Sequence, residues 1–80
     1  MELFSEIKNM IVNVFALEEE SVVSEAHLED DLGGDSLAIM NLAEAIAKHY
    51  GIEIQSEDII EVDNVGELVE LVKLKISSKT

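Results

Sequence analysis

The feature that most constrains the fold is the spacing of apolar residues along the chain. In three stretches they recur at intervals of three and four, which places them on one face of an α-helix. This spacing predicts helices over about residues 2–16, 36–50 and 65–76, and a short helix over about 57–61 lies between the last two. Together these segments predict an all-α four-helix bundle with a short third helix.

The apolar face of each predicted helix indicates the core, and capping residues indicate where the helices begin and end. Asp35 is expected to cap the second helix, Gly51 to end it, and Ser56 to cap the short helix. Asn64 and Glu67 have the spacing of a capping box for the last helix, and the tail of residues 77–80 is expected to fray. The expected core residues are Phe4, Ile7, Ile11, Val14, Phe15, Ile39, Leu42, Ala43, Ile46, Tyr50, Val65, Leu68, Val69, Val72 and Ile76.

A long connection, residues 18–35, joins the first two helices. Loops of this length are often functional. Ser24 is expected to cap one short turn within it, and Gly33 and Gly34 are expected to leave open the approach to the following serine, Ser36. The expected apolar anchors of the connection are Val22, Val23, Leu28 and Leu32.

Length and charge limit the possible functions. The chain has 80 residues, enough for a single small domain over residues 1–80, and it carries eighteen acids, five lysines and no cysteine. A net charge of −13 repels nucleic acid and attracts basic proteins. No apolar run approaches the length of a membrane span, so we expect a cytoplasmic monomer without stable membrane insertion.

Ser36 stands where the long connection gives way to the second helix. The positive end of a helix suits a group that bears a phosphate. The run Gly34-Asp35-Ser36-Leu37 also matches the signature of the GDSL hydrolases, in which a serine needs a histidine base. His49 lies about 20 Å along the same helix and His27 lies in the loop. We therefore interpret Ser36 as a point of attachment and predict that the chain is not an enzyme.

The acidic loop before Ser36 also invites comparison with a calcium-binding loop. When the EF-hand pattern is started at Glu29, the glycine position falls on Gly34, but Gly33 and Met40 occupy ligand positions. Starting the pattern at Asp30 places Leu32 on a ligand position instead. The sequence therefore predicts no specific metal site, and weak binding of divalent cations by the clustered carboxylates is the alternative.

Three segments of the chain form a recognisable pattern: Asp31-Leu32-Gly33-Gly34-Asp35-Ser36-Leu37, Tyr50-Gly51-Ile52-Glu53-Ile54 and Val65-Gly66-Glu67-Leu68. With these segments the chain resembles the acyl carrier proteins over approximately residues 3–76. The resemblance implies a 4′-phosphopantetheine group, derived from coenzyme A, on Ser36 between Asp35 and Leu37. Its thiol would carry acyl groups as thioesters in fatty acid, lipid or polyketide-type biosynthesis.

The resemblance also implies partners and a cavity for the cargo. The partners are a phosphopantetheinyl transferase and acyl-transferring, ketosynthase or adenylating enzymes with basic docking patches. Leu37, Met40 and Glu44 are the candidate partner-binding residues. The candidates for the lining of an acyl cavity are Ile46, Ile54, Ile59, Leu68 and Val72.

The chain departs from the family pattern along the second helix. Members that serve fatty acid synthesis carry acids at the second and fifth positions after the serine, where this chain has Ala38 and Asn41. Glu44 stands where an apolar residue is usual. These departures indicate a specialised carrier. An aminoacyl or peptidyl carrier and an unmodified acidic interaction module are the alternatives.

Overall fold

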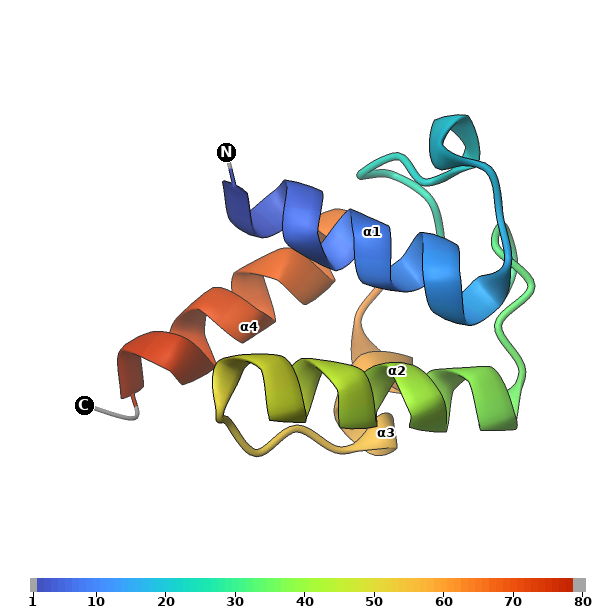
Figure 1. Cartoon of the computed structure of the whole chain (residues 1–80). Coiled ribbons are helices and arrows are strands. Elements are labelled where there is room, and N and C mark those ends of the chain that lie inside the picture. Colours follow the sequence, from blue (N-terminus) through green and yellow to red (C-terminus); the bar gives the residue numbers. More distant parts are fainter. Residues whose placement is uncertain (1, 79–80) are drawn as a thin grey trace.

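The structure, a computed structural model, describes residues 2–78 and is helical throughout its regular elements. Figure 1 shows α1 and α2 running in opposite directions, with α4 against α1 and the short α3 next to α2. The predicted all-α bundle with a short third helix is confirmed. The elements are α1 (Glu2–Phe15), a 3₁₀ turn η1 (Glu19–Ser21), α2 (Ser36–Tyr50), α3 (Ser56–Glu61) and α4 (Val65–Ser78).

The core consists of the apolar faces of the helices and of anchors from the loops. Phe4, Val14, Phe15, Tyr50 and Ile76 lie half-buried at its edge. Among the described residues every buried side chain is apolar, so the bundle is held mainly by the hydrophobic effect. The predicted core residues that are buried are Ile7, Ile11, Ile39, Leu42, Ala43, Ile46, Val65, Leu68, Val69 and Val72.

The ends of α1 and α2 are set by left-handed residues. Ala16 has φ 57°, and the Leu17 amide bonds back to the Val12 carbonyl at 3.1 Å, so α1 ends one residue before the predicted position. Gly51 has φ 65° and ends α2, as predicted. A non-glycine residue in this conformation costs about 1–2 kcal/mol, which explains why the sequence did not reveal the stop at Ala16.

The starts of α3 and α4 depend on side-chain caps. Gln55, and not Ser56, is the N-cap of α3. The backbone amide of Gln55 donates to Asp58 Oδ2 at 2.9 Å. At α4 the Asn64 side chain accepts from the Glu67 amide at 2.9 Å, which confirms the predicted pair. Glu67 Oε1 in turn accepts from the Asp63 amide at 3.0 Å. The prediction of fraying is wrong for residues 77–78, which are helical, and residues 79–80 lie outside the described part of the chain.

The long connection is anchored at both its middle and its end. The anchors Val22, Leu28 and Leu32 are buried, whereas Val23 is 46% exposed and its predicted anchoring role is wrong. The short helical turn lies at Glu19–Ser21 and not after Ser24.

Two backbone hydrogen bonds tie the middle of the connection to the start of α4. The Val65 amide donates to the Ala26 carbonyl at 3.0 Å, and the Gly66 amide donates to the Ser24 carbonyl at 2.9 Å. The first turn of the last helix therefore fixes the loop that leads to Ser36.

Candidate functional site

Ser36 is the first residue of α2 and is exposed. Asp35 has the extended conformation of an N-cap, and its Oδ1 accepts from the Ala38 amide at 2.9 Å, as predicted. The hydroxyl thus stands in solvent at the positive end of a helix of 15 residues. This surrounding fits a phosphodiester on the serine oxygen.

The two glycines before the site have different roles. Gly33 has φ 70°, is exposed, and a Cβ there would meet nothing within 4 Å. Gly34 is buried, and a Cβ there would lie 2.6 Å from Phe15 Cε2 and 2.8 Å from the Leu28 carbonyl oxygen. The expectation that both glycines leave the approach open is therefore wrong for Gly34, which allows close packing of the loop against α1.

Neither histidine is placed to act as a base on Ser36. The Nδ1 atom of His27 accepts hydrogen bonds from the backbone amides of Glu29 and Asp30. His49 lies near the other end of α2, with its Nε2 3.7 Å from Glu6 Oε1. Within residues 2–78 no three histidine or carboxylate side chains are grouped so that they could hold a metal ion. The described residues therefore place neither a histidine base nor a metal ion beside the exposed Ser36 hydroxyl.

The role of His27 was missed by the sequence reasoning, which gave it no function. The residue caps the turn of the long connection that precedes Ser36. Histidine is not among the residues that favour N-cap positions, so the cap preferences contain no signal for it.

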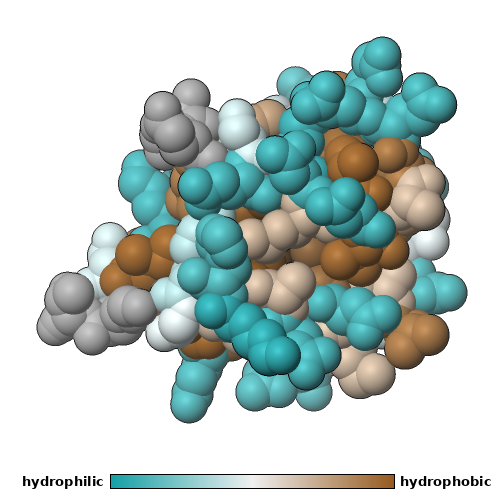
Figure 2. All heavy atoms as spheres, viewed as in Figure 1, coloured by the Kyte–Doolittle hydropathy of each residue, from teal (hydrophilic) through white to brown (hydrophobic). Residues whose placement is uncertain are grey.

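The predicted partner-binding residues lie on the exposed face of α2. Leu37 is 62% exposed and Met40 is 55% exposed, and Glu44 is exposed one turn further along. Figure 2 shows apolar groups gathered at the right of this view, where Figure 1 places the end of α1 and the start of α2, with hydrophilic groups around them. An apolar surface thus adjoins Ser36.

The acidic residues are concentrated on either side of α2 in the sequence. Residues 18–35 hold eight acids and no lysine, and residues 51–70 hold seven acids and no lysine. Between them, α2 contributes only Glu44 and Lys48. The acids therefore lie mainly in the segments that precede and follow α2 in the sequence, and α2 itself contributes little negative charge.

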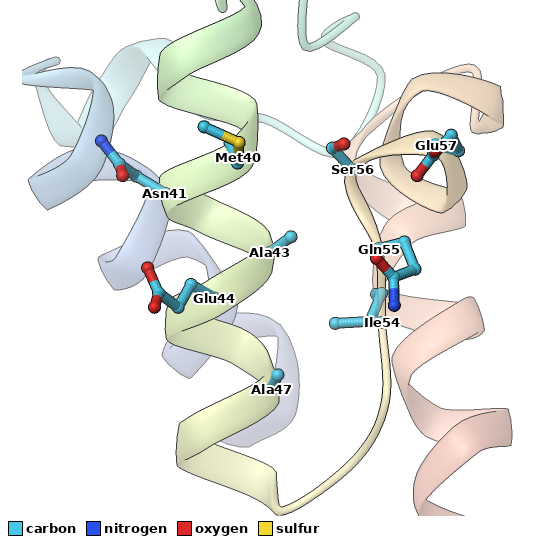
Figure 3. Close-up of a pocket in the computed structure, with 9 residues that line it drawn as sticks. All are labelled: Met40, Asn41, Ala43, Glu44, Ala47, Ile54, Gln55, Ser56 and Glu57. Atoms are coloured by element: carbon cyan, nitrogen blue, oxygen red, sulfur yellow. The ribbon is translucent and has the colours of Figure 1, made fainter.

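A groove of about 540 Å³ runs between α2 and α3. Figure 3 shows Met40, Ala43 and Ala47 on one side of it, and Ile54 on the other. Of the five predicted cavity residues only Ile54 lines this groove. The other four are at most 1% exposed and lie in the core: Ile46, Ile59, Leu68 and Val72.

Comparison with known proteins agrees with this geometry. Residues 5–72 match the family described as the phosphopantetheine attachment site. An acyl carrier protein of Thermotoga maritima is 32% identical over 75 residues, which cover 94% of this chain and 93% of that protein. An acyl carrier protein of Petrotoga mobilis is 32% identical over 76 residues, covering 95% and 89% respectively.

Acyl carrier proteins are carriers and not enzymes, and their cofactor is 4′-phosphopantetheine. In the described part of this chain no helix is both long and apolar enough to cross a membrane. The matched family and the two relatives extend over nearly the whole chain, including the exposed serine at the start of α2. The chain belongs to the acyl carrier protein family.

Proposed function

We propose that Ser36 is the residue that receives 4′-phosphopantetheine and that the chain carries acyl intermediates of fatty acid, lipid or polyketide-type biosynthesis. The observation that carries this proposal is the exposed Ser36 hydroxyl at the capped start of α2, within the matched family region. When bound, the group supplies a thiol that forms thioesters with acyl groups. Asp35 orients the first turn, and Leu37 contacts the transferase.

Mass spectrometry after incubation with coenzyme A and a broad-range phosphopantetheinyl transferase tests the attachment. We expect the protein to gain the mass of one phosphopantetheine group, and Ser36→Ala to gain none. Ser56→Ala is the matched control, because Ser56 is likewise the first residue of a helix. Modification of Ser36→Ala, or an unchanged mass of the natural chain, would contradict the proposal.

Partner enzymes are proposed to dock on α2 through Leu37 and Met40, while their basic residues meet the acids on either side. Ala38 and Asn41 leave α2 without the carboxylates that general fatty acid synthesis uses, which supports a specialised set of partners. Ala38→Asp combined with Asn41→Glu should improve turnover by the enzymes of general fatty acid synthesis. Unchanged turnover would place the recognition elsewhere.

An alkyl cargo is proposed to enter beside Ile54 and to lie among Ile46, Ile59, Leu68 and Val72. Melting temperatures of the protein bearing an octanoyl or an acetyl group on its arm test this. Burial of the longer chain raises the melting temperature because it removes apolar surface from water. Equal melting temperatures would mean that the chain stays in solvent.

An aminoacyl cargo is the second candidate, and the groove gives it a specific observation. Glu44 on α2 and Glu57 on α3 are both among the residues that line it, so an ammonium group on the cargo would be attracted there. Carriers loaded with glycyl or with acetyl groups should then differ in the amide chemical shifts of these two residues. Glu44→Gln should reduce the difference, and identical shifts would speak against this cargo.

A further inference from the structure

His27 forms hydrogen bonds to the turn that precedes the attachment site through both its ring and its backbone amide. Its Nδ1 accepts hydrogen bonds from the amides of Asp30, at 3.0 Å, and Glu29, at 3.2 Å. Its own amide donates to Asp31 Oδ2 at 2.7 Å. This is the reciprocal arrangement of a capping box, with an imidazole nitrogen in place of a hydroxyl oxygen.

The backbone of His27 adds two further bonds to the same turn. Its carbonyl accepts from the amides of Asp31, at 2.9 Å, and Leu32, at 3.0 Å. His27 is thus bonded to four consecutive residues, 29–32, through three of its atoms. A substitution that removes only the ring nitrogen leaves the backbone bonds possible and isolates the contribution of the side chain.

The bonds define the chemical state of the ring. A ring nitrogen accepts a hydrogen bond only when it carries no proton, so the proton of this neutral imidazole is on Nε2. Asp30 Oδ2 lies 3.8 Å from Nδ1, which is too long for a hydrogen bond, whereas the two amides are within range. Nδ1 is therefore an acceptor and not half of an ion pair.

A second set of bonds connects this turn to the residues next to Ser36. The Gly33 amide donates to the Glu29 carbonyl at 3.2 Å, and the Gly34 amide donates to the Leu28 carbonyl at 2.8 Å. Leu28 is buried, and Gly34 packs between its carbonyl and Phe15. These bonds therefore attach Gly33 and Gly34 to the capped turn, immediately before Asp35, the N-cap of α2.

We propose that His27 is a positioning residue for the modification of Ser36. The unprotonated Nδ1 stabilises the turn of residues 28–32, and the turn fixes the positions of Gly33 and Gly34. These two residues in turn fix the orientation of the first turn of α2 and of the Ser36 hydroxyl. His27 acts through the backbone and does not touch coenzyme A or the reacting oxygen. This inference rests on the proposed attachment at Ser36.

The test compares transferase kinetics of His27→Ala and His27→Asn with those of the natural chain. Alanine removes the acceptor that caps the turn. Loss of a helix cap shifts a conformational equilibrium by about fivefold, so we expect kcat/KM to fall by about fivefold. Asparagine supplies an oxygen acceptor and should restore kcat/KM to within about twofold of the natural value. His49→Ala is the matched control, since it removes the other histidine, and it should leave kcat/KM unchanged.

Nitrogen-15 spectroscopy of the natural chain gives a readout that does not depend on a variant that folds. At neutral pH the His27 Nδ1 resonance should be that of an unprotonated nitrogen and Nε2 that of a protonated one. The reverse tautomer would overturn the proposal. Equal kcat/KM for His27→Ala and the natural chain would also overturn it, and the attachment at Ser36 would stand. Failure of the natural chain itself to gain mass would instead overturn the attachment.

Discussion

The Tyr50 hydroxyl donates a hydrogen bond of 2.7 Å to Glu6 Oε1 and so joins the last residue of α2 to the first half of α1. His49 lies against the same carboxylate, and its ring meets that of Tyr50 edge to face with centroids 4.7 Å apart. Burial, followed by the hydrogen bond and the negative charge of Glu6, raises the pKa of the Tyr50 phenol above its ordinary value. This contact fixes the end of α2 that is remote from Ser36.

The Tyr50 phenol should therefore resist ionisation in the folded protein. Because the unfolded chain loses this proton near pH 10 and the folded chain keeps it, stability should fall as the pH rises above about 10. Tyr50 is the only tyrosine and the chain has no tryptophan, so tyrosinate absorbance reports on it directly. Glu6→Gln should lower the pKa of Tyr50, whereas Glu70→Gln should not change it. Titration of the folded protein near pH 10 would contradict the contact.

Tyr50→Phe removes the hydroxyl and leaves the ring. We expect a loss of about 1 kcal/mol in the free energy of unfolding, which is the usual net contribution of a hydrogen bond. Urea denaturation measures it. A double variant with Glu6→Ala should lose little more than either single variant, because Tyr50→Phe removes the donor and Glu6→Ala the acceptor of the same bond.

The two glycines of the long connection should respond differently to substitution. Gly33→Asn places a residue that tolerates positive φ into open space, and the free energy of unfolding should change little. Gly34→Ala inserts a methyl group between Phe15 and the Leu28 carbonyl and should cost about 1–3 kcal/mol. Thermal unfolding of the two variants checks this, and an unaffected Gly34→Ala would mean that the loop can move away from α1.

Leu37 and Leu42 are a matched pair on α2. Leu37 is 62% exposed and Leu42 is fully buried. Leu42→Ala should therefore destabilise the fold by about 2–5 kcal/mol. Leu37→Ala should leave the melting temperature nearly unchanged while it slows modification by the transferase. A large fall in melting temperature for Leu37→Ala would assign this side chain to the core.

Salt should stabilise the protein, because its net charge of −13 is concentrated in two segments. Raising the ionic strength to 0.15 M shortens the Debye length to about 8 Å and weakens the repulsion. A gain of about 1 kcal/mol would raise the melting temperature by about 4–8 °C. Sodium and magnesium chloride at equal ionic strength separate screening from cation binding, and a flat response to both would contradict the prediction.

Local periodicity predicted the helices well because their stripes are internal to each segment. The start of α2 at Ser36 and its end at Tyr50 follow from Asp35 and Gly51, which have strong intrinsic preferences for these positions. The end of α1 at Phe15 and the cap at Gln55 use residues without such preferences. The bonds at these ends are local, from the Leu17 amide to the Val12 carbonyl and from the Gln55 backbone amide to Asp58, but residue preferences alone do not point to Ala16 or Gln55.

At the candidate site, too, some features could be predicted from the local sequence and others could not. The exposure of Ser36 and Leu37 follows from their place before the buried stripe of α2. The packing of Gly34 on Phe15 and the bond between Tyr50 and Glu6 each join segments distant in sequence. Neither contact leaves a pattern in the sequence around it, because the two partners meet only once the helices have packed.

The bonds from Val65 and Gly66 to the carbonyls of Ala26 and Ser24 have a consequence for the timing of maturation. The loop that leads to Ser36 receives these bonds only after the final helix has been synthesised and has docked. In a nascent chain the loop lacks these two bonds until α4 has emerged from the ribosome. We therefore expect the transferase to modify chains that include α4 faster than chains truncated before Val65, which a comparison of the two by mass spectrometry measures.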